Sequence, residues 1–377
     1  MISRIARADS DWNDMAKIAL TGARGFLGWH VRCAAASAGI ETIPIPLGDG
    51  FDLSSAAAAL SDSDEVIHLA GVNRGSDEEV EFGNERFARQ LAEAIARAGN
   101  RPARLVVANS IQAGSPTPYG RGKALASGIL SEAADRSGID FRSVLLPNLF
   151  GEHGRPFYNS VVATFAHQLA VGEEPRVDGD RALTLLHAQD AADVLLGTSD
   201  ASQHETVATV REVLDELRSI ASAYADGTIP DLSSPFRRDL FNTYRAASFD
   251  ARPTIPLQRH ADARGSFFEL VRVAGGGGQS SFSTTVPGVT RGEHYHRRKI
   301  ERFIVLSGEA TISMRRLFHD EVVEFHVRGD EPTAVDMPTM WSHDITNTGA
   351  EALYTAFWIN EVFDPSNPDT YAEKVQP

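Results

Sequence analysis

The sequence has a single cysteine, Cys33, among its 377 residues. One cysteine cannot form an internal disulfide, which is typical of proteins of a reducing compartment. The sequence also lacks an apolar run of the roughly 20 residues that a membrane-spanning helix needs. Its first residues, MISRIARADSDWNDMAK, contain no apolar core of signal-peptide length. We therefore expect a cytoplasmic protein that is neither secreted nor inserted in a membrane.

Basic residues are in deficit, with 36 Lys and Arg against 51 Asp and Glu and a net charge of −15. Such an acidic chain disfavours nucleic acid and anionic membrane surfaces as partners. An anionic substrate is still possible, because helix N-termini and local basic residues bind phosphates. The length suits two domains, and a hydrophobic fraction of 42% can build sizeable cores.

A glycine-rich turn follows a short apolar stretch that ends at Leu20. The segment reads TGARGFLG and places glycines at Gly22, Gly25 and Gly28. Between a strand and a helix, these glycines permit a tight turn and a close approach of the backbone to a pyrophosphate. The helix N-terminus then offers amide donors to the anion. The pattern predicts a dinucleotide site.

Two later strands carry small or polar residues at their ends. DEVIHLAGV ends at Ala70 and Gly71, where a cofactor could lie, and RLVVANSIQA ends at Ser110. PYGRGK follows and places Tyr119 and Lys123 on one face of a helix.

Ketone reduction explains why these three side chains should occur together. It requires a hydride at the carbonyl carbon and a proton at the oxygen, and a free tyrosine has a pKa of about 10. Lys123, with an oxidised nicotinamide nearby, would favour the phenolate, and Ser110 would hydrogen-bond the substrate oxygen. The alternative is a surface tyrosine and lysine without a catalytic role.

The preference for one cofactor depends on Arg24 and on the second strand. ETIPIPLGDG has no carboxylate at its apolar end to hold ribose hydroxyls, whereas Arg24 within the glycine turn can pair with a 2′-phosphate. We expect Asp52 and Leu53 to bracket the adenine. These features favour NADP over NAD.

A set of metal-ligand residue types lies in the segment GVTRGEHYHRRKIERFIVLSG. It contains His294, His296 and Glu301 in the order G-x5-H-x-H-x4-E-x6-G. Residues i and i+2 of a strand share a face, so both imidazoles should point into one cavity, to which the next strand returns a carboxylate. This is a donor set for a divalent metal.

A second motif, DMPTMWSHDITN, adds His343 after a proline-containing turn. The two motifs resemble the signature of a cupin barrel, although Met340 stands where glycine is usual and the gap back to Gly329 is long. The alternative is a set of ordinary strand histidines beside a turn.

The pattern of elements changes along the chain. Apolar strands alternate with helical stretches up to about residue 225, which predicts a parallel sheet. We interpret as a connector the stretch DLSSPFRRDLFNTYRAASFDARPTIP, which has no sustained periodicity. After His260 the sequence predicts only short strands, such as SFFELVRV. The predicted fold is an α/β Rossmann-type doubly wound parallel sheet followed by an all-β jelly-roll barrel. The predicted parts are a polar leader 1–15, a reductase domain 16–250 and a barrel domain 251–377.

With these motifs in view, the chain resembles the CapF-type capsular polysaccharide enzymes, which join an extended short-chain dehydrogenase/reductase to a C-terminal cupin. The segments that carry the resemblance are LTGARGFLG, HLAGVNR, NSIQA, PYGRGK, LPNLFG, NSVVATF, LTLLHAQD, NTYR, RGSFFE, RGEHYH and NEVFDPSNPDTY. The resemblance implies a UDP-linked 2-acetamido-6-deoxy-4-ketohexose as substrate, epimerised at C3 by the cupin and reduced at C4 with NADPH. It also implies a zinc ion, a product of the 6-deoxy-talose type that leads to N-acetyl-L-fucosamine, and a homodimer.

The candidate residues fall into three sets. The catalytic set is Ser110, Tyr119 and Lys123, and the metal set is His294, His296, Glu301 and His343. The cofactor-binding set is Gly22, Arg24, Gly25, Phe26, Leu27, Gly28, Asp52, Leu53, Leu69, Ala70, Gly71, Pro147 and Asn148. Residues 151–160 are expected to line the sugar pocket.

Several alternatives stay open at the level of sequence. The metal could be iron, manganese or nickel and could be structural. The general base could be His294 if no metal binds, and otherwise His260, Lys299 or Tyr354. The cupin could be a dimerisation or sugar-binding module, or an oxygenase with redox-active iron. A nucleotide-sensing protein without activity is disfavoured by the Tyr-x3-Lys pair.

Overall fold

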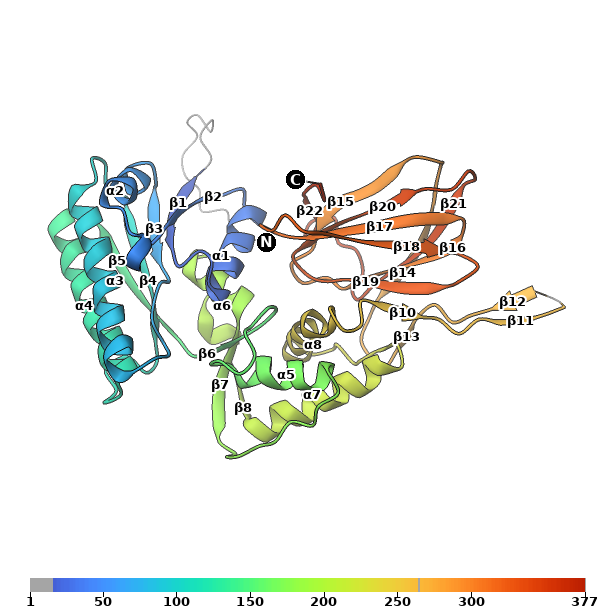
Figure 1. Ribbon diagram of the computed structural model, residues 1–377, viewed down its shortest axis with the longest axis horizontal. Coiled ribbons are helices and arrows are strands. Elements are labelled where there is room, and N and C mark those ends of the chain that lie inside the picture. The colour runs from blue at the N-terminus through green and yellow to red at the C-terminus, as the bar shows by residue number, and fades with distance from the viewer. Residues whose placement is uncertain (1–15, 264, 377) are drawn as a thin grey trace. The chain divides into compact units, whose positions relative to one another are not determined.

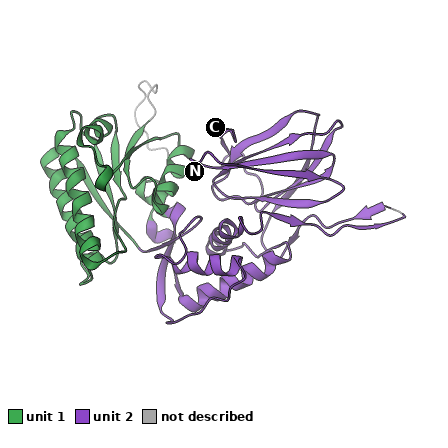
Figure 2. Ribbon diagram, in the orientation of Figure 1, with its two compact units in different colours: residues 1–146, 191–200 green, residues 147–190, 201–377 purple. Residues whose placement is uncertain are grey.

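The computed structural model describes residues 16–263 and 265–376. The predicted polar leader, 1–15, lies outside the described residues. The chain forms two compact units (Figure 2). Of the described residues, unit 1 comprises 16–146 together with Ala191–Asp200, and unit 2 comprises Pro147–Asp190, 201–263 and 265–376.

Unit 1 is built on a five-stranded parallel sheet of order β2-β1-β3-β4-β5 (Figure 1). Its strands are β1 Lys17–Thr21, β2 Glu41–Ile45, β3 Glu65–His68, β4 Arg104–Ser110 and β5 Asp140–Leu146. The helices between them are α1 Phe26–Ser37, α2 Leu53–Ser61, α3 Asp77–Arg97 and α4 Pro118–Ser137, with a short 3-10 turn η1 at Gly48–Gly50. Because the strand order reverses between β1 and β3, the carboxyl ends of these two strands form the switch point at which such sheets bind ligands.

The helices of unit 1 begin and end where local chemistry favours it. α3 starts with a capping box in which Ser76 accepts from Glu79 N and the Glu79 side chain accepts from Ser76 N. α4 starts with a Thr117 cap and Pro118, and ends at Gly138 in the left-handed conformation. Apolar residues of β1, β3 and β4 pack against α2, α3 and α4 in one core. The predicted α/β part of the fold is confirmed.

Unit 2 begins with a helical lobe, here the described residues 147–190 and 201–250. Its three-stranded sheet has the order β6-β7-β8, with bounds Asn148–Phe150, Ala182–His187 and Thr206–Thr209. Its helices are α5 Val161–Ala170, α7 Val210–Ala225 and α8 Pro235–Ser248, with a 3-10 turn η2 at Ala201–Gln203. α6, Ala188–Leu195, contains the boundary between the two units.

The rest of unit 2 is a barrel of two antiparallel sheets. One has the order β10-β19-β16-β21-β14, with bounds Thr254–Pro256, Thr333–Met337, Glu301–Ser307, Leu353–Ile359 and Gln279–Thr285. The other has the order β18-β17-β20-β15-β22, with bounds Val322–Arg328, Glu309–Arg316, Trp341–Asn347, Thr290–Tyr295 and Tyr371–Ala372. Side chains from both sheets, such as Phe303 and Ile312, share one core. The predicted jelly-roll barrel is confirmed.

Two small pairings complete unit 2. β11 (His260–Asp262) and β12 (Gly265–Phe267) form a hairpin, and β13 (Arg272–Val273) pairs with β9 (Thr228–Ile229) of the lobe. The stretch SFFELVRV was predicted as one strand, and this was wrong. It is divided between β12 and β13 because its two ends pair with different partners.

The predicted connector of residues 231–256 was also wrong, since it contains α8. Many of the residues that α8 buries are polar, such as Asn242 and Arg245. These side chains reach hydrogen-bond acceptors in the barrel: Arg245 Nη1 donates to Met337 O over 3.0 Å. Apolar residues recur at helical spacing within α8, at Phe236, Leu240 and Tyr244, but the prolines, serines and arginines of the whole stretch obscure this short pattern.

The lobe and the barrel share a core, so the division into units differs from the predicted boundary after residue 250. Ile300 and Trp358 of the barrel pack with lobe residues such as Phe241. Beside them, Arg302 donates from Nε to Asp336 Oδ1 over 2.6 Å, and the Tyr224 hydroxyl donates to Asp336 Oδ2 over 2.7 Å. The predicted domain boundary itself stays a prediction.

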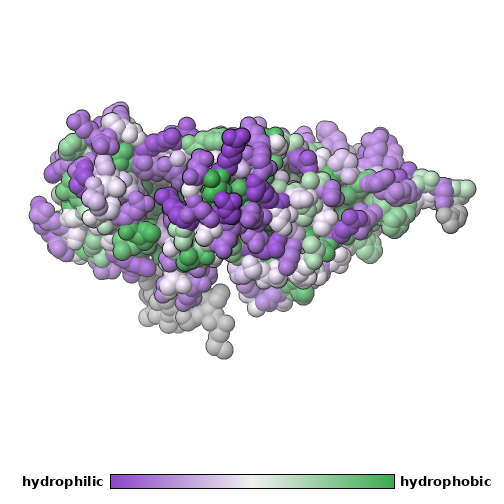
Figure 3. All heavy atoms as spheres, turned by 90° about the horizontal axis from the view of Figure 1, so that it is seen from below, coloured by the Kyte–Doolittle hydropathy of each residue, from purple (hydrophilic) through white to green (hydrophobic). Residues whose placement is uncertain are grey.

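No helix among the described residues is both long and apolar enough to cross a membrane. Polar and apolar side chains are interspersed over the face shown in Figure 3.

Candidate functional site

The glycine turn lies at the switch point of unit 1, between β1 and α1. Gly22 has a φ of +70°, and a Cβ placed there would lie 2.8 Å from Ala70 N. A Cβ on Gly28 would lie 2.1 Å from Gly22 O. Both positions therefore require glycine. The resulting turn leads into the N-terminus of α1, where Phe26 and Leu27 are the first helical residues. The N-cap residue is Gly25, so no side chain of the cap bonds the first amide groups of the helix.

The ends of β1 and β3 are joined by Thr21, which sequence reasoning missed. Its Oγ1 accepts from Leu69 N over 3.1 Å and from Ala70 N over 3.2 Å, and lies 2.9 Å from His68 Nδ1. The hydroxyl hydrogen is therefore available to His68, whose pKa is lowered to about 3 by burial and by nearby Lys123. The Thr21 hydroxyl, oriented by a neutral, buried imidazole, thus holds the predicted residues Leu69 and Ala70 beside the glycine turn.

The other candidate cofactor residues occupy separate positions. Asp52 is the N-cap of α2, where Oδ1 accepts from Ser55 N over 2.7 Å, and Leu53 is the first residue of that helix. Arg24 is exposed within the turn. Pro147 and Asn148 belong to unit 2, and Asn148 Nδ2 donates to Thr184 O over 3.0 Å. A cofactor role for these residues stays a prediction.

The Gly28 contact gives a sharp test of the turn. Gly28→Ala is expected to weaken NADPH binding by at least about tenfold, because the added methyl group forces α1 away from Gly22 O. Isothermal titration calorimetry measures this.

Gly128→Ala is the matched control. Gly128 lies in α4 with no heavy atom within 4 Å of a Cβ placed there. This variant should bind NADPH normally and be as stable or slightly more stable, since glycine inside a helix costs about 0.5–1 kcal/mol relative to alanine. Equal NADPH affinity in both variants would contradict the role of the turn.

The predicted catalytic set comes together in unit 1. Ser110 is the last residue of β4, and Tyr119 and Lys123 lie one turn apart near the start of α4. Tyr119 lies near enough to Ser110 for the two side chains to interact, and Lys123 Nζ donates to Ala108 O over 2.6 Å. Lys123 is therefore held against β4, the strand that ends at Ser110.

Burial controls the ionisation of this set. It raises the pKa of Tyr119, and the interaction with Ser110 acts in the opposite direction with a smaller effect. Burial also lowers the pKa of Lys123 to about 8. The protein alone therefore keeps Tyr119 protonated at neutral pH, unlike the lowered pKa that we predicted for the cofactor-bound state. A protonated tyrosine is the form that can donate a proton to a ketone oxygen.

The glycines of PYGRGK have a packing role that the sequence motif did not reveal. A Cβ on Gly120 would lie 2.1 Å from Ser115 Oγ, and one on Gly122 would lie 3.0 Å from Glu81 O in α3. They let the start of α4 pack closely against its neighbours. This packing places Tyr119 beside Ser110.

The four predicted metal-set residues converge inside the barrel. They come from β15, β16 and β20 and the turn after β15, and their ligand atoms all lie within 4.8 Å of one another. Glu301 Oε2 is central, at 2.9 Å from His296 Nε2, 3.1 Å from His343 Nε2 and 3.8 Å from His294 Nε2. A bulge with Gly292 and Glu293 at positive φ shifts the register of β15 just before His294. We call these four residues the quartet.

The hydrogen bonds around the quartet orient its histidines. His296 Nδ1 lies 2.5 Å from Asp369 O, and His343 Nδ1 lies 3.1 Å from Trp341 O. A carbonyl can only accept, so each Nδ1 carries a hydrogen, and each Nε2 faces the centre, where its lone pair could bind a cation. Metal-binding histidines are commonly held in this way, so the donor set fits a divalent cation.

The carboxylate of the quartet is ionised despite its burial. Burial alone would raise the pKa of Glu301, but the three histidines around Oε2, of which His296 and His343 lie within hydrogen-bond distance, outweigh it and hold that pKa well below its usual value. Burial lowers the pKa of His343, although Glu301 opposes this. An anionic oxygen and neutral imidazoles are the protonation states that bind a metal.

The three weak candidates for a general base lie elsewhere. His260 is exposed in the β11–β12 hairpin, and Tyr354 lies one position from inward-facing Leu353 and Thr355, on the outer face of β21. Lys299 Nζ donates to Pro368 O and lies 5.6 Å from the centre of the Phe363 ring. These positions do not support any of the three as the base.

The segment predicted to line the sugar pocket borders a cavity of about 160 Å³ in the lobe. Gly151, His153, Gly154 and Pro156 line it, with His167 of α5 and Asp250 among the other lining residues. Glu152 instead contacts the barrel: Thr339 Oγ1 donates to Glu152 Oε1 over 2.6 Å. The same segment thus contributes to a cavity and to a contact with the turn that precedes β20, the strand that carries His343.

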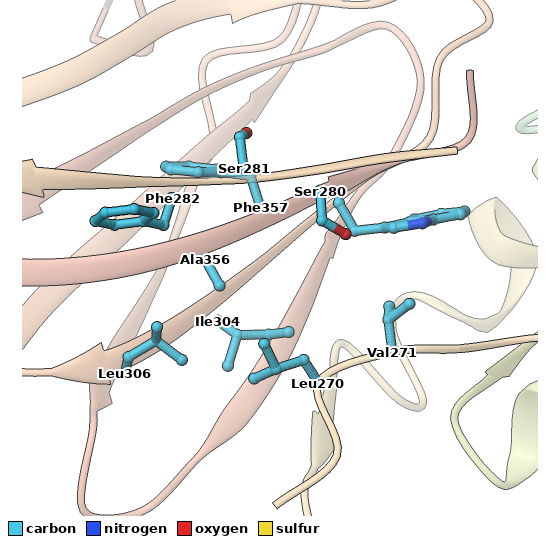
Figure 4. Close-up of a pocket in the computed structure, with 10 residues that line it drawn as sticks. Leu270, Val271, Ser280, Ser281, Phe282, Ile304, Leu306, Ala356 and Phe357 are labelled. Carbon is cyan, nitrogen blue, oxygen red and sulfur yellow. The ribbon is translucent and has the colours of Figure 1, made fainter. Parts of the chain in front are cut away.

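A second, apolar cavity of about 330 Å³ lies on the outer face of the barrel (Figure 4). Ile304, Leu306 and Ala356 are among the residues that line it, and alternation along β16 places Ile304 on the face opposite to Glu301. This cavity is therefore separate from the quartet.

Comparison with known proteins agrees with this arrangement. Residues 18–207 match the NAD dependent epimerase/dehydratase family, and residues 260–371 match the polysaccharide biosynthesis C-terminal domain. The crystal structure of the capsular polysaccharide assembling protein CapF from Staphylococcus aureus is 33% identical, covers 95% of this chain and 100% of its own, and has a TM-score of 0.59. The chain belongs to the CapF-type family.

Two curated relatives extend the comparison of this CapF-type protein. The UDP-2-acetamido-2,6-beta-L-arabino-hexul-4-ose reductase of Pseudomonas aeruginosa is 33% identical over 369 residues, which is 94% of this chain and 98% of that protein. The spore coat polysaccharide biosynthesis protein SpsL of Bacillus subtilis is 28% identical over 122 residues, which is 30% of this chain and 81% of that protein.

Both groups of candidate residues lie inside the matched regions. The glycine turn and the Ser110–Tyr119–Lys123 set are within the epimerase/dehydratase match, and the quartet is within the C-terminal match. Because the chain belongs to these families, it is an enzyme that uses a nicotinamide cofactor.

Proposed function

We propose that this protein is a bifunctional UDP-sugar enzyme that epimerises C3 and then reduces the C4 ketone of a UDP-2-acetamido-2,6-dideoxy-4-ketohexose. The observation that carries the proposal is the presence of two chemically different sites in one chain. A Ser–Tyr–Lys set lies in unit 1, and a three-histidine, one-carboxylate quartet lies in the barrel. The Pseudomonas aeruginosa relative, a reductase of a hexul-4-ose, supports the same substrate class. The product would be a 6-deoxy-talose-type amino sugar, a precursor of N-acetyl-L-fucosamine for surface polysaccharide.

The reduction assigns a separate task to each residue of the catalytic set. The bound nicotinamide would supply a hydride to C4. Tyr119 would give its hydroxyl proton to the carbonyl oxygen as the alcohol forms, and Ser110 would hold that oxygen by a hydrogen bond. Lys123, held against Ala108 O near Ser110, would favour the resulting phenolate. One ketone, one hydride from the cofactor and one proton from Tyr119 thus become one alcohol, one oxidised cofactor and a phenolate, which regains its proton from water.

The order of the two reactions follows from the acidity of the C3 proton. That proton is acidic only while C4 is a ketone, because the carbanion is then an enolate. Reduction removes this activation, so epimerisation comes first. The quartet would hold a divalent metal, which we propose to be zinc, and the bound cation would supply positive charge for the substrate oxygen.

Arg24 supports NADPH over NADH as the reductant. Arg24→Ala is expected to weaken NADPH binding by about ten- to a hundredfold, since hydrogen bonds to charged groups contribute about 1.5–3 kcal/mol. NADH binding should change little because NADH lacks the 2′-phosphate. Fluorescence titration with both cofactors measures the difference.

Arg136→Ala is the control for this variant, because Arg136 is an exposed arginine in the last turn of α4. Equal losses of NADPH and NADH affinity in Arg24→Ala would contradict the assignment.

The alternative function is a reductase whose barrel serves only for dimerisation or sugar binding. The apolar outer face of the barrel favours an additional role as a contact surface, since Phe282 beside the 330 Å³ cavity is 70% exposed.

We propose that the protein forms a homodimer. Dimerisation and catalysis by the barrel are compatible, because the apolar cavity and the quartet lie on opposite faces of the sheet.

One experiment separates the bifunctional reading from the alternative. The protein is incubated in D₂O with UDP-GlcNAc-derived 4-keto-6-deoxy sugars, with and without NADPH, and the products are followed by NMR. Deuterium at C3 without NADPH, followed by reduction at C4 when NADPH is added, is the expected result. Reduction without any exchange at C3 would favour the alternative, and substrate-dependent oxygen uptake would indicate an oxygenase.

A further inference from the structure

Asp369 is a buried acidic residue in the tail segment DPSNPDTY, between β21 and β22. It is 2% exposed, and its φ of +43° is unusual for a residue other than glycine. Buried charges need partners, and a strained backbone persists only where the surroundings hold it. The contacts of Asp369 explain both features.

Its carboxylate accepts hydrogen bonds from three successive backbone N–H groups. Oδ1 accepts from Arg297 N over 3.1 Å, and Oδ2 accepts from Arg298 N over 3.0 Å and from Lys299 N over 2.8 Å. Successive N–H groups that point to one centre form an anion-binding concavity. These three residues are the turn that connects His296 to Glu301, so the carboxylate holds the part of the chain that sets the spacing of two quartet members.

The backbone carbonyl of Asp369 acts on the quartet directly. It accepts the hydrogen bond from His296 Nδ1 over 2.5 Å, while Nε2 of the same ring lies 2.9 Å from Glu301 Oε2. The positive φ of Asp369 gives the residue a backbone conformation in which its carboxylate and its carbonyl bond the same short segment.

The rest of the tail holds Asp369 in place. Tyr371 and Ala372 of β22 pair with Tyr295 and His294 of β15. Arg298 Nη2 donates to Glu361 Oε1 over 3.0 Å. The tail is thus bonded to the ligand-bearing strand and to the turn that follows it.

We propose that Asp369 is a positioning residue of the quartet, which pre-sets the turn between His296 and Glu301 and the orientation of the His296 ring. This inference rests on the proposed metal centre. Partners of this kind, which orient a ligand without touching the metal, typically change metal affinity by about 10–100-fold when they are removed.

Two variants separate the carboxylate from the backbone conformation. Asp369→Gly removes the carboxylate but tolerates the positive φ, and Asp369→Asn keeps the shape with one acceptor oxygen. Asp364→Asn is the matched control, because Asp364 is an exposed aspartate of the same tail whose carboxylate accepts from its near neighbour Ser366.

The first measurement is the affinity for Zn²⁺, by competition with a chromophoric chelator. We expect a loss of about 10–100-fold in Asp369→Gly, a smaller loss in Asp369→Asn and no change in Asp364→Asn. A cooperative thermal unfolding transition of the barrel in chelator-treated protein verifies that each variant is folded there, and if Asp369→Gly does not fold, Asp369→Asn decides. Unchanged Zn²⁺ affinity in folded Asp369 variants would overturn the inference.

The second measurement does not depend on a metal. ¹⁵N NMR of the histidine rings in chelator-treated protein should show His296 with the hydrogen on Nδ1 in the wild type and a mixture of tautomers in Asp369→Gly. A wild type that binds no Zn²⁺ would contradict the proposed metal centre, whereas the tautomer comparison would still decide the role of Asp369. An identical His296 signal in wild type and variant would overturn the inference.

Discussion

Tyr119→Phe is expected to lower the rate of NADPH oxidation with the 4-keto sugar by about 10²–10⁴-fold, the usual contribution of a positioned proton donor. Burial raises the pKa of Tyr119, so the hydroxyl carries its proton at neutral pH and can give it to the ketone oxygen. Phenylalanine keeps the ring and its packing but has no proton to donate. NADPH absorbance in single-turnover experiments measures the effect.

The same variant should leave C3 exchange in D₂O unchanged. Exchange is assigned to the quartet in unit 2, whereas Tyr119 belongs to unit 1. Tyr354→Phe is the control, because Tyr354 is 43% exposed on the outer face of β21. Reduction at a near-wild-type rate in Tyr119→Phe would show that another group is the acid.

His296→Ala is expected to abolish stoichiometric metal binding and to remove the response of the barrel to chelators. A metal that binds only the folded barrel stabilises it by mass action, by about 2.7 kcal/mol when the free metal is at 100 times its dissociation constant. His296 contributes an Nε2 that faces the centre of the quartet, and its loss leaves Glu301 without one of its three histidine partners. Metal analysis and scanning calorimetry with and without chelator test this.

The wild type should unfold at a lower temperature after chelation, and His296→Ala should unfold at the same temperature with and without chelator. NADPH binding should be normal in both proteins, because the glycine turn belongs to unit 1. His326→Ala is the matched control: His326 is exposed on β18 and hydrogen-bonds Thr311. A wild-type barrel without metal and without a thermal response would refute the centre and return His294 to the role of a free base.

The candidate catalytic residues of unit 1 could be selected from the sequence because they are related by short, regular offsets. Gly22 and Gly28 flank one turn, and Tyr119 and Lys123 lie one helical turn apart. What could not be predicted is the support from neighbouring strands. Thr21 holds the backbone of Leu69 and Ala70, 48 and 49 residues away, and this bond depends on the parallel pairing of β1 and β3.

α8 shows a different limit of prediction. This helix buries the polar side chains of Asn242 and Arg245, and the partner of Arg245, Met337 O, lies in the barrel 92 residues further along the chain. A polar residue that is buried with a distant partner cannot be distinguished in sequence from an exposed one. The shared core of the lobe and the barrel was therefore not foreseen.

The sequence by itself determined the types and spacing of the chemical groups: the glycines of the turn, the Ser–Tyr–Lys set, and the histidines and glutamate of the barrel. Tertiary structure alone decided that Glu301 lies at the centre of the quartet and that Asp369 binds the turn beside it, 70–72 residues away in sequence. The physical reason is that strand alternation and helical periodicity are local properties of the chain. The hydrogen bonds that orient a side chain connect groups that only the folded backbone brings together.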